Sequence, residues 1–281
     1  MTTSIITDTV FGTNDEQEFA ARWLDWHRQR VAEISAPYGF LAITALHWVT
    51  QDATAFEGLP GQWWEHDDWL YIDLKVGESL VFNGTEISGV HKLGSIAEGD
   101  SFTLGLGEVI IEAAKRGGKY LLRPRHPQNQ LRQKFIGVPG YDPDTTWVVE
   151  GRFTRFAEPR KTKVGAVVDG IKHIYRTPGE ITFELAGCTH TLLAFTGHTE
   201  GSLNIVFTDA TSGKTTYAAN RSLQIAAPGT DGKVILDFNR AVNLPCAFTD
   251  LATCPLPPAR NRLPMAIAAG EKIPYERMAI R

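Results

Sequence analysis

Apolar residues recur at helical spacing near the start of the chain and at every second position over most of the rest. Residues 14–35 have the helical pattern, which predicts one amphipathic helix. Pro37 ends the pattern because proline cannot continue a helix. We expect the tryptophans of the apolar stripe to pack in the core against a sheet, because large aromatic side chains dominate core burial. The stripe consists of Phe19, Trp23, Trp26, Val31 and Ile34.

The segments that follow the helix are short, rich in β-forming residues and bounded by Gly, Asn or Asp. Residues 40–48 fit either a strand or a short helix. Asn83 and Gly84 form an Asn-Gly dipeptide, which is a strong hairpin signal. No helical pattern separates the segments, so a β-sandwich or barrel is expected rather than alternating βα units. The strands predicted here cover residues 69–74, 79–82, 90–94, 101–104, 108–113 and 119–125.

A passage rich in proline and glycine lies within residues 123–144 and is the predicted boundary between two β units. Further strands are expected at residues 147–156, 180–185, 190–195, 203–208 and 233–238. From residue 239 onward six prolines disfavour regular structure, yet the segment is apolar, so it predicts an ordered strap over the second unit. The expected fold is mainly β, with two antiparallel barrel or sandwich units. We divide the chain into an N-terminal helix (1–37), a β-sandwich-like unit (38–138) and a second β-barrel unit with a C-terminal Pro-rich strap (139–281).

Composition and charge narrow the classes of function. The net charge is -4, and the 28 basic and 32 acidic residues are interspersed, which argues against a nucleic-acid-binding stripe. The sequence contains no run of about 18 consecutive apolar residues, so no membrane-spanning helix is expected. The first ten residues lack the pattern of a secretory signal. Three cysteines are too few for a disulfide framework, and together these features predict a cytoplasmic protein. The oligomeric state cannot be read from the sequence.

The first group of candidate functional residues lies at the start of the strap. Asp237 and Asn239 share a strand face, because alternate residues of a strand point the same way. In a functional interpretation Arg240 holds an anion, Asn239 and Asn243 position it, and Cys246 is a nucleophile or redox thiol. Asp237 is the second candidate catalytic residue. Alternatively, these side chains form a buried polar network that satisfies the backbone of an irregular segment. The spacing of Cys246 and Cys254 does not predict a metal site.

The second group consists of arginines near the predicted boundary. Arg123 and Arg125 share a strand face and suit a phosphate or carboxylate clamp, because guanidinium is planar and presents several donors. With Arg240 and Arg262 they would line a cleft between the two units, which is a common place for ligands. The alternative is ion pairing within the protein. Three further candidates would face the same pocket or brace a turn: Tyr217, Asn220 and Arg221.

The strap motif resembles one family. Its segments are Asp237-Phe-Asn-Arg-Ala-Val-Asn-Leu-Pro-Cys-Ala-Phe-Thr, Ala252-Thr-Cys-Pro-Leu-Pro-Pro, Asn261-Arg-Leu-Pro and Ala269-Gly-Glu-Lys. They are similar to domain-of-unknown-function family 1684, a family of uncharacterised bacterial and archaeal proteins. Three upstream passages, Leu46-His-Trp, Arg116-Gly-Gly-Lys-Tyr-Leu-Leu-Arg and Thr216-Tyr-Ala-Ala-Asn-Arg-Ser-Leu, extend the resemblance over residues 40–275. The chain departs from the family pattern at Val242, Leu244, Ala218, Ala219 and Arg260. The resemblance implies no activity.

The sequence therefore predicts a protein that binds a small anionic molecule in a polar pocket near the C-terminal motif, and it leaves open whether the protein is an enzyme. Two alternatives are a non-enzymatic structural or interaction module and a flavin-binding split barrel. No flavin fingerprint, dinucleotide-binding G-x-G-x-x-G, Walker loop or G-x-S-x-G elbow occurs in the chain, so the cofactor is unknown.

Overall fold

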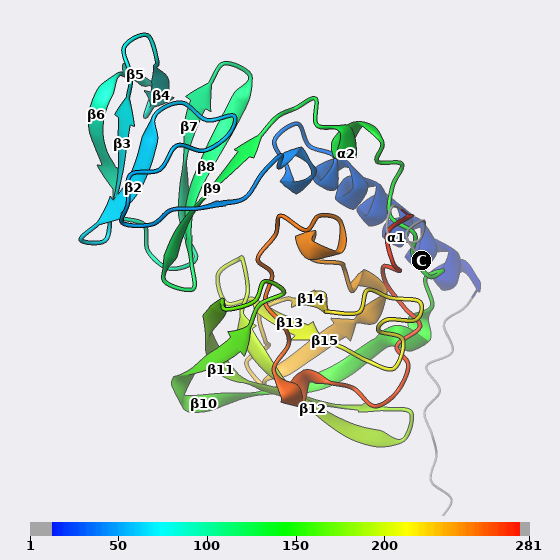
Figure 1. Ribbon diagram of the computed structural model, residues 1–281. Coiled ribbons are helices and arrows are strands. Elements are labelled where there is room, and N and C mark those ends of the chain that lie inside the picture. Colours follow the sequence, from blue (N-terminus) through cyan, green and yellow to red (C-terminus); the bar gives the residue numbers. More distant parts are fainter. Residues whose placement is uncertain (1–12, 276–281) are drawn as a thin grey trace, which may run out of the picture.

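The computed structural model describes residues 13–275 and shows a mainly β protein with one long helix at its N-terminal end (Figure 1). Helix α1 (Thr13–Ile34) matches the predicted helix to within one residue at each end. Three antiparallel sheets follow, so the mainly β fold expected from the sequence is confirmed. None of the helices in residues 13–275 is long and apolar enough to cross a membrane.

Two sheets form the first β unit. The six-stranded sheet has the order β1 (His47–Trp48), β9 (Lys119–Arg125), β8 (Val109–Arg116), β7 (Ser101–Leu106), β4 (Leu80–Phe82) and β5 (Thr85–Ile87). The three-stranded sheet has the order β2 (Gln62–His66), β3 (Trp69–Leu74) and β6 (Gly89–Gly94). Side chains of both sheets meet in one hydrophobic cluster around Trp63, Ile72 and Ile111, which makes this unit a sandwich.

The second β unit is a single six-stranded antiparallel sheet. Its order is β14 (Arg221–Ile225), β13 (Leu203–Phe207), β12 (Cys188–Thr196), β11 (Lys172–Leu185), β10 (Val148–Gly165) and β15 (Lys233–Asp237). The sheet curves into a half-barrel (Figure 1). The edge strands β14 and β15 are not paired with each other. Instead the chain leaves β15, turns through η3 (Phe238–Arg240) and pairs Val242 with Ser222 of β14 through two 2.8 Å backbone hydrogen bonds.

The C-terminal strap completes the core of the second unit. Phe238, Leu263 and Ile267 are buried in the same cluster as the inward-facing side chains of the sheet. The strap contains η4 (Pro245–Ala247) and η5 (Ala259–Asn261), both short. An apolar segment without regular structure is therefore ordered by packing, as the sequence predicted. The predicted domain boundaries at residues 37 and 138 remain predictions.

Helix α1 packs on the strap and the inter-unit passage rather than on a sheet. The indole Nε1 of Trp23 donates a 2.8 Å hydrogen bond to the carbonyl of Asn239, and the ring lies against Gly140. Ile34 is fully buried in a separate cluster with Phe248 of the strap. The apolar stripe of α1 was correctly predicted, but it packs on the strap and the inter-unit passage and not on the sheet that the sequence analysis expected.

The remaining elements are short. The segment that fits either a strand or a helix contains both, because η1 (Phe40–Ala42) precedes β1. Helix α2 (Gln130–Gln133) and η2 (Thr145–Trp147) lie in the passage between the units. The sequence analysis did not predict β2 and β5, whose polar and exposed positions give a weak alternation signal.

Candidate functional site

A cavity of about 510 Å³ lies where the two β units and the strap meet. Three parts of the chain form its walls. The first unit contributes Glu98, Gly99, Arg116 and Arg123; the second contributes His173, Ile174, Tyr175, Arg176 and His198; the strap contributes Leu244, Pro245, Ala252, Thr253, Cys254 and Pro255. We call it the interface cavity.

A glycine turn sets the close approach of the two units beside this cavity. A Cβ at Gly117 would lie 3.0 Å from Cγ2 of Ile171 and 3.2 Å from the backbone N and O of Lys172. Gly117 also has φ +60°, a left-handed conformation that glycine adopts without strain. The carboxylate of Glu98 accepts hydrogen bonds from the N–H groups of Gly117 (2.7 Å) and Gly118 (2.8 Å). The turn is thus fixed in place at the cavity wall.

Arg123 and Arg125 share one buried carboxylate, that of Glu112 on the neighbouring strand β8. Arg123 binds it in a bidentate manner, with Nε–Oε2 at 3.0 Å and Nη2–Oε1 at 2.6 Å. Arg125 donates hydrogen bonds to Oε2 of Glu112, and its Nη1 donates a 2.8 Å hydrogen bond to the carbonyl of Tyr38. Burial acts to raise the pKa of Glu112, but the two guanidinium groups outweigh it and hold that pKa below its usual range. Two cations and one anion leave a local excess of positive charge.

Arg116 adds to this excess. Its Nη1 donates to the backbone carbonyls of Asp100 (2.8 Å) and Lys115 (2.7 Å), and the described part of the chain offers it no carboxylate within ion-pair distance. Burial, followed by the positive charge of Arg123, lowers the pKa of Arg116. A partly buried cation beside a like charge is a position that an anion would stabilise.

The opposite wall comes from β11, where His173 and Tyr175 share a strand face. His173 is buried, and its Nε2 lies 2.5 Å from the carbonyl of Thr253 in the strap. Burial, with the nearby Cys254, raises the pKa of Tyr175 to about 12. The phenol is therefore a neutral donor at physiological pH, positioned at the cavity.

Two thiols lie at the base of the cavity, and two predicted site residues surround them. The backbone N–H of Cys246 donates to Sγ of Cys254 at 3.3 Å, and the amide of Asn220 lies 3.8 Å from Sγ of Cys246. The Nδ2 of Asn220 also donates a 2.7 Å hydrogen bond to the carbonyl of Pro255. The hydroxyl of Tyr217 hydrogen-bonds to the Cys246 thiol. The structure therefore brings Cys246, Tyr217 and Asn220 together, with Cys254 as a fourth member.

The other residues of the strap motif lie elsewhere. Asp237 accepts from the N–H (3.1 Å) and Nδ2 (2.9 Å) of Asn239 and pairs with Arg240 (Nε–Oδ2 3.2 Å). Asn239 is buried and exchanges two 2.9 Å hydrogen bonds with the backbone of Asp144. This arrangement ties the end of β15 to the inter-unit passage, and none of these side chains lines the interface cavity.

Asn243, near the start of the strap, is connected both to the end of the strap and to helix α1. Its N–H donates to Oε2 of Glu271 (2.6 Å), and its Nδ2 donates to the carbonyl of Lys272 (2.7 Å). Arg30 of α1 donates to the carbonyl of Asn243 (2.9 Å) and pairs with Glu271 (3.1 Å). Burial raises the pKa of Glu271, against the opposing effect of Arg30. Asn243 thus serves packing of the helix, in agreement with the structural alternative.

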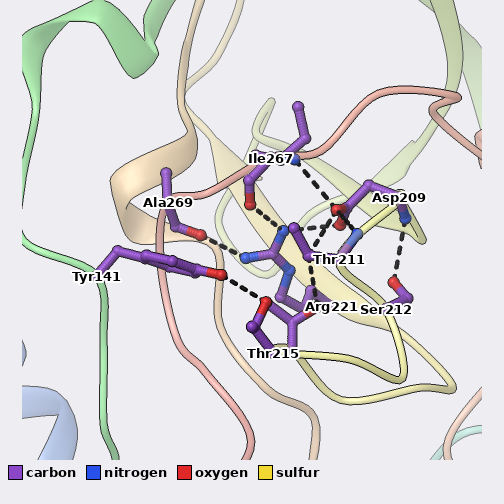
Figure 2. A network of polar contacts seen from close by, with 9 residues as sticks. Tyr141, Asp209, Thr211, Ser212, Thr215, Arg221, Ile267 and Ala269 are labelled. Atoms are coloured by element: carbon purple, nitrogen blue, oxygen red, sulfur yellow. Dashed lines mark hydrogen bonds and ion pairs between the residues drawn. The ribbon is translucent and has the colours of Figure 1, made fainter.

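Arg221 is buried in a polar network beneath the strap (Figure 2). Its Nη2 bonds Oδ2 of Asp209 (2.8 Å) and the carbonyl of Ile267 (3.0 Å), and its Nη1 donates to the carbonyl of Ala269. Asp209 also accepts from the N–H (2.8 Å) and hydroxyl (2.6 Å) of Thr211. The network fastens the strap to β13 and β14. Arg221 is not in the wall of the interface cavity.

The predicted site residues therefore separate into groups rather than forming one pocket. Arg123 reaches the cavity, and Cys246, Tyr217 and Asn220 lie behind it. Arg125 pairs with Glu112, and Arg262 is exposed on the strap. The sequence analysis did not select His173 and Tyr175 as site residues, because it predicted no strand between residues 156 and 180; in β11 their i, i+2 spacing places them on one face.

A second cavity, of about 580 Å³, lies within the first unit. Its charged or ionisable lining residues are His47, Glu57 and His126, without Arg or Lys. Burial lowers the pKa of His47 against the opposing effect of Glu57, and this lowering favours the neutral ring. This cavity does not suit an anion. Among the described residues, no group of three or more His, Cys, Asp or Glu side chains is arranged to hold a metal ion.

The comparisons with known proteins establish the family. The family model described as "Protein of unknown function (DUF1684)" matches residues 133–272. An uncharacterized protein of Haloarcula marismortui, known from a solution NMR structure, is 32% identical to this chain; the match covers 50% of this chain and 78% of that one, with a TM-score of 0.43. The chain belongs to this family. No curated protein matches it.

Membership of DUF1684 confirms the resemblance predicted from the strap motif. The matched segment contains β10 to β15 and the strap. The upstream passages at Leu46 and Arg116 lie before residue 133, so the family match is shorter than the sequence analysis expected. The interface cavity combines matched residues, such as His173 and Cys254, with Arg116 and Arg123, which precede the match.

Proposed function

We propose that this protein binds a small anionic molecule in the interface cavity. The observation that carries the proposal is Arg116, a partly buried guanidinium beside Arg123 with hydrogen bonds only to backbone carbonyls. The lining includes three arginines (Arg116, Arg123 and Arg176) and a single carboxylate, Glu98, which already accepts two backbone hydrogen bonds. An anion would complete the charge balance of this wall.

The other walls favour a ligand with hydrogen-bond acceptors and a compact body. Tyr175 presents a neutral phenol that donates to an anion without charge repulsion. Leu244, Pro245 and Ala252 supply apolar surface from the strap. A few polar groups on a largely apolar lining are typical of small-molecule sites. The proposal leaves open whether the bound molecule is converted.

A structural role is the better interpretation for one part of the strap motif. Asp237, Asn239 and Asn243 are engaged with backbone groups and line no part of the interface cavity. This is the arrangement that the structural alternative predicted. The motif therefore serves two purposes in our proposal: these three residues order the strap, and its Cys246–Pro255 portion forms the base of the ligand site.

The test is a thermal-shift screen of the purified protein against inorganic phosphate, phosphorylated sugars, organic acids, nucleotides and flavins. A ligand that binds the native state raises Tm by linkage, and the best hit is then titrated by calorimetry. We expect Arg116→Met to weaken binding at least about tenfold, because charge-assisted hydrogen bonds contribute about 1.5–3 kcal/mol.

Arg28→Met is the matched control, because Arg28 lies on the exposed side of α1 and pairs only with Asp25. Binding should be unchanged in this variant and should weaken in all proteins as salt rises. The proposal is wrong if no anion shifts Tm, or if Arg116→Met binds the best hit as tightly as the unsubstituted protein.

A further inference from the structure

Cys246 and Cys254 form a pair of free thiols in direct contact. Both are free, and the N–H of Cys246 donates to Sγ of Cys254 at 3.3 Å. The two thiols also hydrogen-bond to each other. The chain returns through residues 248–253 to bring them together, eight positions apart in the sequence. Both thiols also belong to one small buried cluster with Ala252.

The two thiols differ in access and in environment. Cys254 lines the interface cavity, whereas Cys246 lies behind it and is 3% exposed. The hydrogen bond from Cys254, supported by Asn220 and Tyr217, lowers the pKa of Cys246 against the opposing effect of burial. The same hydrogen bond, together with burial, raises the pKa of Cys254. The two thiols are therefore inequivalent, and Cys254 holds its proton more tightly than Cys246 does.

We propose that Cys246 and Cys254 are a thiol–disulfide exchange centre, at which the dithiol reduces a small anionic disulfide bound in the interface cavity. The choice of an anionic substrate rests on the proposed function, because the arginines that line the interface cavity (Arg116, Arg123 and Arg176) would attract a negatively charged substrate. The centre itself rests on the contact between the thiols and on the position of Cys254 at the cavity.

The reaction balances without any further reagent. Cys254 Sγ attacks one sulfur of the disulfide RSSR and gives up its proton to the departing RS⁻, which takes the electron pair of the broken S–S bond and leaves as RSH. Cys246 then attacks Sγ of the Cys254 mixed disulfide and loses its proton to the second RS⁻, which departs as RSH. The dithiol is oxidised by two electrons and RSSR is reduced by two. Exchange is reversible, so excess RSH restores the dithiol.

The arrangement of charges fits these steps. The hydrogen bond with Cys246 and burial raise the pKa of Cys254, and the guanidinium of Arg123 acts in the opposite direction. Arg116, also at the cavity, would hold a carboxylate of the substrate. Departing RS⁻ would be stabilised by the same positive wall. A cationic disulfide with the same S–S bond would be repelled, and this difference makes the proposal testable.

The experiment uses a Cys188→Ser protein, because Cys188 is exposed and would form mixed disulfides of its own. This protein is incubated with glutathione disulfide, which is anionic, or with cystamine, which is cationic. Aliquots are alkylated and mapped by mass spectrometry. We expect an intramolecular Cys246–Cys254 disulfide, formed at least about tenfold faster with glutathione disulfide than with cystamine, as a positively charged cleft concentrates anions. Arg116→Met should lose this preference.

A second variant identifies the attacking sulfur. Cys246→Ser should accumulate a glutathione mixed disulfide at Cys254, whereas Cys254→Ser should accumulate none at Cys246. In the unsubstituted protein Cys188 reports the reactivity of an exposed thiol toward both reagents and corrects for their intrinsic difference. A Cys246–Cys254 disulfide that forms no faster with glutathione disulfide after this correction would contradict the anionic substrate.

Failure of this inference is separable from failure of the proposed function. Phosphate binding to the Cys188→Ser protein is followed by thermal shift in parallel, and it involves no sulfur chemistry. If phosphate binds but neither disulfide oxidises the pair, the exchange centre is wrong and the anion site stands. If no anion of the thermal-shift screen binds and neither disulfide oxidises the pair, both proposals are wrong.

Discussion

Arg221 and Asp209 form an ion pair with almost no contact with solvent: Nη2 lies 2.8 Å from Oδ2, and the side chains are 1% and 0% exposed. Burial lowers the pKa of Arg221, and Asp209 acts in the opposite direction. Such a pair is held by its surroundings, here two strap carbonyls and the hydroxyl of Thr211. The pair therefore places the C-terminal strap on the second β unit.

We predict that Arg221→Met lowers the free energy of unfolding by about 3–5 kcal/mol, because Asp209 is then left buried without its cation. The measurement is chemical denaturation monitored by circular dichroism. The matched control is Arg260→Met, since Arg260 pairs with Glu180 at the surface and such pairs contribute about 0–1 kcal/mol. Equal losses in the two variants would contradict the structural role of the buried pair.

Arg30 provides the corresponding contact for helix α1. Arg30→Met removes both the bond to the carbonyl of Asn243 and the partner of Glu271, which is 1% exposed. We expect a loss of about 3–5 kcal/mol, together with faster hydrogen exchange along α1. Arg28→Met, on the same helix, should change stability by less than about 0.5 kcal/mol and leave the exchange unaltered. Unchanged exchange in Arg30→Met would show that α1 docks without this contact.

The glycine turn between the β units gives a matched pair of substitutions. Gly117 and Gly118 both have positive φ, +60° and +78°, so alanine at either costs about 1–2 kcal/mol of backbone strain. Only at Gly117 would the new Cβ meet the second unit; at Gly118 nothing lies within 4 Å. We predict that Gly117→Ala lowers the free energy of unfolding by about 1–3 kcal/mol more than Gly118→Ala does, because the new Cβ overpacks the contact with the second unit. Equal effects in thermal denaturation would mean that the two units do not approach closely here.

Stability should depend on pH through Glu112. Its folded-state pKa is depressed below the unfolded value of about 4.3, so its contribution is present above that value and is lost as pH falls through the folded pKa. At neutral pH Glu112→Gln should be less stable than the unsubstituted protein by about 3–5 kcal/mol. The difference should narrow below about pH 4.3, as measured by urea unfolding across the pH range.

The control for this pH dependence is Glu108→Gln, at an exposed position in the turn before β8. It should differ from the unsubstituted protein by no more than about 0.5 kcal/mol at every pH. If the difference for Glu112→Gln is the same at pH 7 and at about pH 2, the carboxyl of Glu112 is not held ionised by its two arginines.

The sequence predicted the candidate site only in part, and the reason is the spacing of the contacts. Cys246 and Asn220 were each selected, yet their contact joins residues 26 positions apart. Arg123 and Cys254 approach each other across the two units, which no local pattern encodes. By contrast, Arg123 and Arg125 share a face because they are two positions apart on one strand, and the structure places both on Glu112.

The sequence by itself determined the elements: the helical stripe of α1, most strands through their alternation, and the strap through its combination of prolines and apolar side chains. It also determined the family, through the strap motif. Only the tertiary structure decided which polar residues order the chain and which reach the cavity. Asp237 and Cys254 belong to one motif, but the first caps a strand end and the second lines the cavity. The physical reason is that an irregular segment has no period, so the direction of each side chain is set by packing against distant parts of the chain.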